Sequence, residues 1–168
     1  MTQSDLEQLA DNAAVVAGLD PALVKAIIEQ ESSWESWAWN PEPRYRFLMN
    51  VRLWIPFRSL TPEERASEIP PPDFPVLMGD RDQEWWGQQA SWGLMQIIGG
   101  VARECGFKGP YLPELLNPEI NLRFGCRHLI KKLKAAGQDV IKALLAWNGG
   151  GNPNYPQEVV ARMSHYRV

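Results

Sequence analysis

The stretch "VKAIIEQESSW", residues 24 to 34, carries the pattern of a core helix and one residue that breaks it. Val24, Ile27 and Ile28 recur at helical spacing and form an apolar face. The next position on that face is Glu31, whereas Glu29 projects to the other side, which we expect to be solvated. The stretch therefore predicts an amphipathic helix whose apolar stripe ends in a carboxylate.

A carboxylate on an apolar stripe must be paired, kept neutral, or placed at the edge of a cleft. Loss of hydration raises its pKa, so it can hold a proton near neutral pH. A protonated carboxyl group in a cleft is what glycosidic bond cleavage requires, because it donates its proton to the leaving oxygen. The alternative is a structural role, in which Glu31 bonds to a neighbouring backbone group or an arginine.

Helical signals dominate the rest of the chain. Ser4 with Glu7 has the spacing of a capping box, and Gly18 is a helix-ending glycine. Asp20 followed by Pro21 is typical of an N-cap and a first helical residue. The sequence predicts helices over residues 4–16, 20–34, 117–137, 139–147 and 157–166.

Residues 41–90 have a different character, because they contain more than half of the 14 prolines. Thr61 with Glu64 resembles a capping box, and Pro62 fits the first helical position, so residues 61–69 are predicted to form a short helix. The rest should be irregular or form short strands. We expect an ordered segment and not a linker, because it also holds Tyr45, Phe47, Trp54, Phe57 and Phe74.

Length and composition limit the possible classes of protein. A chain of 168 residues with 45% hydrophobic content predicts one globular domain. The net charge of −3 gives no reason to expect nucleic acid as a partner. No run of about 18 apolar residues is present, so no membrane span is expected. The first residues carry acids and no basic region, so a secretory signal is not expected.

Cysteine and histidine indicate no metal or redox site. Cys105 and Cys126 lack metal-ligand spacing and are too few for a disulfide framework, so we interpret them as small core residues. His128 and His165 have no partner pattern, and we interpret both as structural.

Tryptophan is unusually frequent, with eight residues. Most large aromatic side chains contribute to the core, but their flat faces also suit the apolar faces of sugar rings. Two clusters are candidates for ligand contact: Trp34, Trp37, Trp39, and Trp85, Trp86, Trp92.

Three later stretches follow the first one in a characteristic order: "ASWGLMQI" (90–97), "NPEINLRFG" (117–125) and "ALLAWNGG" (143–150). Together with "IIEQESSW", they resemble the catalytic domain of the soluble lytic transglycosylases, in the goose-type lysozyme superfamily. The resemblance covers about residues 20–40 and 88–165. It implies a mainly α (α+β, lysozyme-like) fold: one compact helical domain over residues 1–168, of the phage type, with residues 41–90 as an irregular insertion.

The resemblance also implies an activity on peptidoglycan glycan strands, without a cofactor or metal ion. Glu31 looks like the single acid/base of the family. It would protonate the oxygen between N-acetylmuramic acid and N-acetylglucosamine. Its carboxylate would then take the proton from the muramoyl C6 hydroxyl, which closes on C1 and gives a 1,6-anhydro end. Participation of the N-acetyl group would replace a protein nucleophile.

Three further motif residues are candidates for substrate binding. Ser32 could orient the carboxyl group or bond the substrate, or it could be an ordinary polar residue at a helix end. Gly93 would let the backbone approach a sugar closely. Gln96 offers a donor and an acceptor for an acetamido group, or else it satisfies a loop backbone.

The remaining motif residues lie in the same stretches. Met95 is expected to pack beneath the site, although it counts among the substrate-binding candidates. Asn148 is a candidate for contact with substrate or Glu31, the alternative being a helix C-cap. Trp147 replaces the tyrosine of the family's Ala-Tyr-Asn motif, so a hydroxyl for the acid must come from Tyr155 or another tyrosine.

The spacing between the motifs departs from the family. Glu31 and Gly93 are 62 positions apart, where the family needs only a short loop. We expect the inserted residues to wall or extend the sugar cleft, with Trp85 and Trp86 at its rim. On a strand these adjacent residues would face opposite ways, so that one packs inward and the other faces the cleft.

Two alternative functions stay open at this point. A hydrolytic muramidase would need a second carboxylate about 6.5–9.5 Å from the acid. The candidates are Glu42, Asp80, Asp82 and Glu84, each otherwise expected to be a solvated surface acid. A non-catalytic glycan-binding or virion structural module is disfavoured by the intact Glu31-Ser32 pair. We expect a monomer that is made in the cytoplasm and delivered to the cell wall by a holin or a virion.

Overall fold

The computed structural model describes residues 1–167, and most of its regular structure is helical. This confirms the mainly α fold class predicted from the sequence. The α-helices are α1 (Gln3–Ala17), α2 (Pro21–Ser32), α3 (Pro62–Ala66), α4 (Arg81–Gln88), α5 (Gly99–Glu104), α6 (Pro118–Ala135), α7 (Val140–Trp147) and α8 (Tyr155–Met163). Two 3₁₀ helices are η1 (Leu112–Leu116) and η2 (Ser164–Tyr166).

The strands are short and form two separate antiparallel sheets. One has the order β1-β4-β5 and consists of β1 (Trp39–Pro41), β4 (Ala90–Trp92) and β5 (Ile97–Ile98). The other pairs β2 (Met49–Asn50) with β3 (Ile55–Pro56). In the β1–β4 ladder, Trp39 is opposite Trp92, and Asn40 is opposite Ser91. Since neighbouring residues of a strand point to opposite faces, the tryptophan pair and the polar pair lie on different faces of the sheet.

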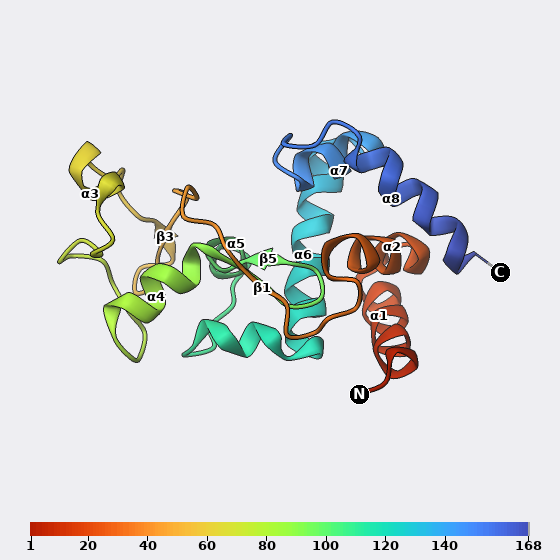
Figure 1. Ribbon diagram of the computed structural model, residues 1–168, viewed down its shortest axis with the longest axis horizontal. Helices are drawn as coiled ribbons and strands as arrows, with labels where there is room; N and C mark the ends of the chain where they lie inside the picture. Colours follow the sequence, from red (N-terminus) through yellow and green to blue (C-terminus); the bar gives the residue numbers. More distant parts are fainter. Residues whose placement is uncertain (168) are drawn as a thin grey trace.

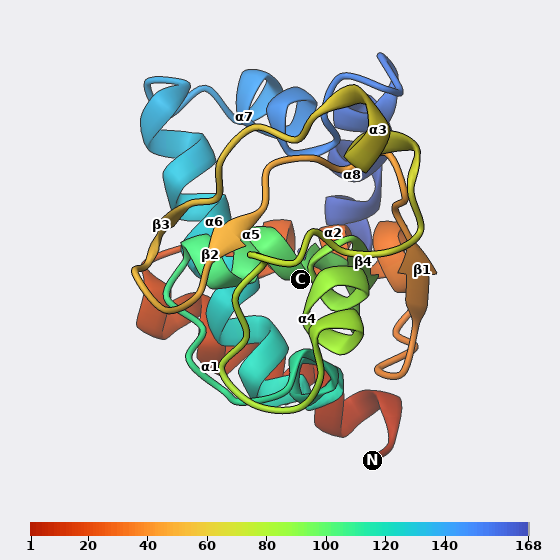
Figure 2. The ribbon, with the colours of Figure 1, turned by 90° about the vertical axis from the view of Figure 1, so that its left-hand side faces the viewer.

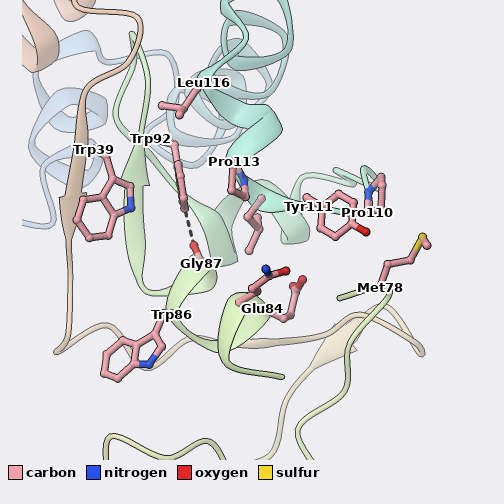
Figure 3. Close-up of a pocket in the computed structure, with 12 residues that line it drawn as sticks. Trp39, Met78, Glu84, Trp86, Gly87, Trp92, Pro110, Tyr111, Pro113 and Leu116 are labelled. Carbon is pink, nitrogen blue, oxygen red and sulfur yellow. Dashed lines mark hydrogen bonds between the residues drawn. The ribbon is translucent and has the colours of Figure 1, made fainter. Parts of the chain in front are cut away.

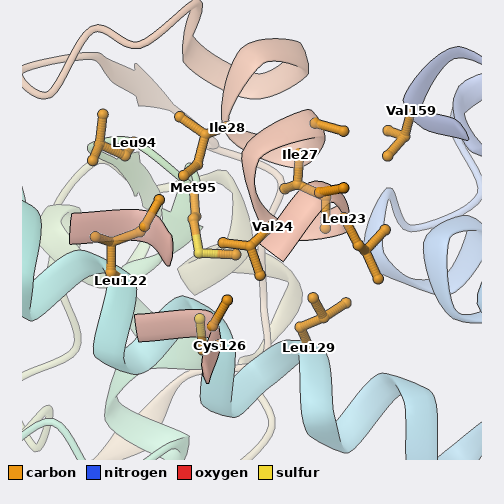
Figure 4. Packing of buried hydrophobic residues seen from close by; sticks show 14 of the residues in the cluster. Leu23, Val24, Ile27, Ile28, Leu94, Met95, Leu122, Cys126, Leu129 and Val159 are labelled. Atoms are coloured by element: carbon orange, nitrogen blue, oxygen red, sulfur yellow. The ribbon is translucent and has the colours of Figure 1, made fainter. Parts of the chain in front are cut away.

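The main core surrounds α2, which packs against α1 and α8, while α6 packs against α1 and α7 (Figure 1). The apolar stripe read from the sequence is buried as predicted, because Val24, Ile27 and Ile28 have no exposed surface. Figure 4 shows Val24 and Ile28 beside Met95, in the cluster that also includes Leu129 of α6 and Val159 of α8. The free thiols of Cys105 and Cys126 are both buried, which confirms their interpretation as core residues.

The local signals at the start of α2 are confirmed. Gly18 adopts the left-handed conformation (φ 67°) that ends α1, and the Asp20 side chain accepts the Ala22 N–H. The capping box predicted for α1, Ser4 with Glu7, is wrong. Thr2 and Asp5 form the capping box, so Ser4 already lies in the first turn of the helix. Both pairs have the same spacing, and the chain uses the one nearer its start.

Residues 41–90 form a lobe at one end of the elongated molecule, and Figure 2 views the molecule from that end. The lobe has a small core of its own, in which Leu48, Leu60, Phe74 and Trp85 are buried. This confirms that the segment is ordered. The predicted short helix is α3, capped by the reciprocal bonds between Thr61 and Glu64.

The expectation of irregular structure or strands fails at residues 81–88, which form helix α4. Asp80 caps it by accepting the Gln83 N–H. Because successive residues are about 100° apart on a helix, the adjacent residues Trp85 and Trp86 still face different environments. Trp85 is 2% exposed, whereas Trp86 is 39% exposed.

The interpretation of Glu84 as a solvated surface acid is also wrong. Its carboxylate is buried and pairs with the buried Arg103 of α5 at 2.7 Å. The same guanidinium donates to the carbonyl oxygens of Phe107 and Gly109. This network joins α4 to the rest of the protein. Desolvated charges are stable only when they are fully paired, and here each charged group has its partner.

Glu29 is less solvated than its helical position suggested. Its side chain is 24% exposed, and it accepts a hydrogen bond from the Tyr166 hydroxyl at 2.7 Å. The C-terminal η2 covers that side of α2, which the local pattern could not indicate. None of the helices described for residues 1–167 has the length and apolar character needed to cross a membrane.

Candidate active site

Glu31 lies in the last turn of α2 and borders a pocket with a volume of about 650 Å³. The pocket is enclosed by β1 and the loop after it, by the segment around β5, by α6 and by the end of α7. Its lining includes Asn40, Glu42, Tyr45, Phe47, Ser91, Gln96, Glu104, His128, Lys132, Trp147, Asn148 and Gly149. Most of the polar residues singled out in the motifs therefore border one cavity.

Two donors hold the Glu31 carboxyl group from one side. The Trp147 indole Nε1–H donates to Oε1 at 2.9 Å, and the Tyr155 hydroxyl donates to the same oxygen. Within residues 1–167, no protein hydrogen bond reaches Oε2. The carboxyl group is thus anchored through one oxygen, and the other keeps its bonding capacity.

The surroundings of Glu31 raise its pKa above the ordinary value of 4.5. Burial is the largest cause, because it disfavours the charged form. The hydrogen bonds from Tyr155 and Trp147 oppose this effect, since they stabilise the carboxylate. The nearby negative charge of Glu42 raises the pKa further.

The turn at residues 93–96 contributes Gln96 to the pocket lining. Gly93 is left-handed (φ 65°), and a Cβ there would lie 2.8 Å from the Leu115 carbonyl oxygen. Buried Asn121 accepts the Met95 N–H at 2.8 Å and donates to the Trp92 carbonyl oxygen at 2.7 Å. A side chain cannot be added at Gly93 without moving backbone, which explains the glycine.

Ser32 and Gln96 stabilise this turn. The Ser32 hydroxyl lies 2.8 Å from the Leu94 carbonyl oxygen, so it ties α2 to the turn. The Gln96 amide donates to the carbonyl oxygens of Gly93 and Ala38, and it accepts a bond from Asn40 at 2.6 Å. The backbone-satisfying alternative for Gln96 thus describes its protein contacts, although its side chain also lines the pocket.

Comparison with known families gives a match to the transglycosylase SLT domain over residues 8–160. The chain belongs to the SLT transglycosylase family. No curated protein and no solved structure gives a significant match. Members of the family are peptidoglycan lytic transglycosylases, so the protein is an enzyme that degrades peptidoglycan.

In this SLT domain the predicted site residues fall into three groups. Glu31, Gln96, Trp147 and Asn148 line the common pocket, with Tyr155 bonded to Glu31 from behind. Tyr155 therefore supplies the hydroxyl that Trp147 lacks. Ser32, Gly93 and Met95 do not line the pocket, and Met95 is fully buried. Trp85 and Trp86 do not border the Glu31 pocket: Trp85 is in the small core of the lobe, and Trp86 lines a different pocket.

The pocket of the SLT domain also contains Glu42, Tyr45, Phe47 and His128. The sequence indicated Glu42 only as the second carboxylate of a hydrolase, and it indicated none of the other three as a site residue. Glu42, Tyr45 and Phe47 follow β1, and only the pairing of β1 with β4 brings them beside α2. His128 packs against Trp147, with ring centroids 5.1 Å apart, and burial lowers its pKa to about 4. No sequence signal marked this neutral histidine as a neighbour of the acid's hydrogen-bond donor.

The pocket offers no metal site of the usual kind. Among residues 1–167, no group of three or more His, Cys, Asp or Glu side chains is arranged to hold a metal ion. The pocket offers the Glu31 carboxyl group with its raised pKa, the further ionisable side chains of Glu42, Glu104 and Lys132, and neutral hydrogen-bonding groups.

Proposed function

We propose that Glu31 is the single general acid/base of this lytic transglycosylase. The observation that carries the proposal is the asymmetric bonding of a buried carboxyl group at a 650 Å³ pocket. Trp147 and Tyr155 both donate to Oε1, which leaves Oε2 for the substrate. A raised pKa keeps a proton available on that group when the pH exceeds the ordinary carboxyl value.

Glu31 acts in two steps on the β-1,4 bond between N-acetylmuramic acid and N-acetylglucosamine. It first gives its proton to the bridging oxygen as the bond to C1 breaks, and the N-acetyl group stabilises the muramoyl C1. The carboxylate then removes the proton from the muramoyl C6 hydroxyl, whose oxygen bonds to C1. The product carries a 1,6-anhydro end, and Glu31 recovers its proton, so no water is consumed.

The donors to Oε1 and the burial of Glu31 have opposite effects that suit this cycle. Burial favours the protonated acid needed for the first step. The bonds from Trp147 and Tyr155 favour the carboxylate needed for the second step. A carboxyl group balanced between both forms can work as acid and as base in one turnover.

Substrate binding in the proposed site uses the residues around Glu31. Gln96 and Asn148 border the pocket and can bond sugar hydroxyl or acetamido groups. Tyr45 and Phe47 supply an aromatic wall from residues 41–90. We therefore propose that residues 41–90 are an insertion into the SLT domain that walls the cleft through its first residues.

Glu31→Gln tests the proposal. The amide preserves shape and can still accept from Trp147 and Tyr155, but it cannot exchange the proton. Lysis of purified cell walls should fall at least about 100-fold, while the Tm should not fall, because the cost of a buried charge is removed. Retention of more than about a tenth of the activity would remove Glu31 from the mechanism.

A hydrolytic muramidase is the second candidate function. Among the four acids considered as its second carboxylate, Glu42 is favoured by its position. Glu42 borders the same pocket, accepts a bond from the Ser91 hydroxyl, and raises the pKa of Glu31. In that mechanism Glu42 would activate a water molecule.

Glu42→Gln separates the two reactions. For the transglycosylase, most activity should remain, and mass spectrometry of soluble products should show ends lighter by one water than reducing ends. A loss as large as that of Glu31→Gln, together with reducing ends in the wild-type products, would establish hydrolysis.

A further inference from the structure

A second pocket, with a volume of about 590 Å³, lies between β1, α4, β4 and η1. Its wall is unusually rich in aromatic side chains: Trp39, Trp86, Trp92 and Tyr111. Figure 3 shows Trp39 and Trp86 on one side, Tyr111 and Met78 on the other, and Trp92 between them. No residue of this lining also lines the Glu31 pocket.

The two pockets use opposite faces of the same small sheet. Trp39 and Trp92 are a cross-strand pair that faces the aromatic pocket. Asn40 and Ser91, the next pair, face the Glu31 pocket. Because side chains alternate across a sheet, the aromatic pocket is separate from the catalytic cleft and is not an extension of it.

The aromatic pocket is mostly apolar, but three of its aromatic side chains carry N–H or hydroxyl groups that are free to bond a ligand. Trp39, Trp86 and Tyr111 are between 39% and 51% exposed. Within the part of the chain that the structure describes, their indole N–H and hydroxyl groups make no hydrogen bond to protein. Trp92, by contrast, donates to the Gly87 carbonyl oxygen and is buried. Gln83 adds a primary amide to the lining.

The electrostatics of the aromatic pocket select a neutral ligand. Among the residues that line this pocket in the described part of the chain, Glu84 alone has a charged side chain. The Glu84 carboxylate is already paired with Arg103. An ionic ligand would therefore find no counter-charge there. A purely apolar ligand would leave the indole and amide groups unpaired, which lowers affinity. A pyranose ring fits both requirements, since it has an apolar C–H face and hydrogen-bonding edges.

We propose that the aromatic pocket is a second glycan-binding site, which takes neutral N-acetylhexosamine residues of a glycan strand. The family's substrate is a polymer that presents many copies of this sugar close to the bond being cleaved. A second contact with the polymer raises the effective concentration of the substrate at the catalytic pocket. The site acts by retaining the enzyme on the wall and takes no part in bond cleavage.

The binding test uses the tetramer of N-acetylglucosamine and the indole N–H signals of the intact protein in NMR spectra. Trp39 and Trp86 report the aromatic pocket, Trp147 reports the Glu31 pocket, and Trp37, which lines neither pocket and is 70% exposed, is the control. The signals of Trp39 and Trp86 should shift in a saturable way. In Trp86→Ala, the Kd from the Trp39 signal should weaken about tenfold, with the Trp147 titration unchanged.

Two results of this titration would overturn the second site. The Trp39 and Trp86 signals could stay still while Trp147 saturates, or Trp39 could follow Trp147 with one Kd that Trp86→Ala does not change. Because the readout is binding and the probe carries no peptide, it is independent of the proposed role of Glu31. Failure of Glu31→Gln to abolish lysis would leave this result standing.

The activity test compares an insoluble with a short soluble substrate. On purified cell walls, Trp86→Ala should raise KM about tenfold with little change in kcat, and Trp37→Ala should match the wild type. On a short soluble glycan fragment, which cannot span both pockets, both variants should match the wild type. An equal loss for Trp86→Ala on both substrates would make the pocket part of the catalytic cleft and overturn the inference.

Discussion

At the scale of single residues, the chemistry depends on how Glu31 is bonded. Its burial raises the pKa, and the donors Tyr155 and Trp147 lower it. The tyrosine that the family motif would supply at position 147 is replaced by tryptophan, and Tyr155 brings a hydroxyl to the same carboxyl oxygen. Two neutral donors thus act on one oxygen from different helices, α7 and the start of α8.

Tyr155→Phe should move the pH profile in a defined direction. The hydroxyl stabilises the carboxylate, so its removal raises the pKa of Glu31 further. Because the first step needs the protonated acid, the high-pH limb of kcat should shift to higher pH. Proton donation in the first step forms the Glu31 carboxylate, which this variant no longer stabilises by the hydrogen bond from position 155. We therefore expect kcat to fall about tenfold, as for loss of one hydrogen bond to a charged group.

The measurement is kcat against pH on a soluble glycan fragment, with the Tm recorded at each pH. Tyr166→Phe is the control, because that hydroxyl bonds Glu29 and not Glu31. A high-pH limb that stays in place or moves to lower pH would contradict this account of the Glu31 pKa.

At the scale of elements, the short helix α4 places one of two adjacent tryptophans in a core and the other at the surface. The Trp85 ring packs edge-on to Phe74 at 5.1 Å between centroids and belongs to the core of the lobe. Trp86 points into the aromatic pocket. The prediction that one of the pair faces inward is therefore correct, but the reason is a helix and not a strand.

Trp85→Ala should lower the free energy of unfolding by about 3–5 kcal/mol, since it leaves a cavity among Leu48, Leu60 and Phe74. Trp86→Ala should leave the midpoint of urea unfolding nearly unchanged, because its ring is partly exposed. Equal losses of stability in both variants would show that both rings are structural. The Trp86 ring would then not be available to a ligand in the aromatic pocket.

The local caps show what could be read at this scale without the fold. Asp20, Pro21 and Gly18 fixed the start of α2 and the end of α1 correctly, because a cap involves only residues within one turn. Helix α4 was missed, although Asp80 caps it in the same way, because the prolines that precede it in the chain indicated an irregular segment.

At the scale of the whole molecule, a buried ion pair joins the lobe of residues 41–90 to the rest of the protein. Glu84 is on α4 and Arg103 is on α5, and Arg103 also holds the backbone at Phe107 and Gly109. The side chains of both charged residues are almost inaccessible to water. The placement of the lobe relative to the rest of the protein therefore rests in part on a buried ion pair, and loss of one partner would leave the other charge buried and unpaired.

Arg103→Met should destabilise the protein by about 3–5 kcal/mol, because it leaves the Glu84 carboxylate buried without a partner. The double variant Arg103→Met with Glu84→Gln should recover part of that loss, since no charge remains buried. Lys142→Met, which removes the exposed ion pair with Asp139, is the control and should leave the unfolding midpoint unchanged. Urea unfolding of the four proteins checks the result, and a double variant no better than Arg103→Met would contradict the buried-charge explanation.

The sequence by itself determined the helical fold class, the end of α1, the start of α2 and the exceptional position of Glu31, because these follow from residues within a few positions of one another. The four motifs in order also indicated the family that the match over residues 8–160 confirms. Only the tertiary structure decided which distant groups meet. Tyr155 reaches Glu31 across 124 positions, Glu84 finds Arg103 in the interior, and the β1–β4 register sends Trp39 and Asn40 into separate pockets. Such contacts depend on how helices and strands pack in space, and the local pattern of side chains carries no information about that packing.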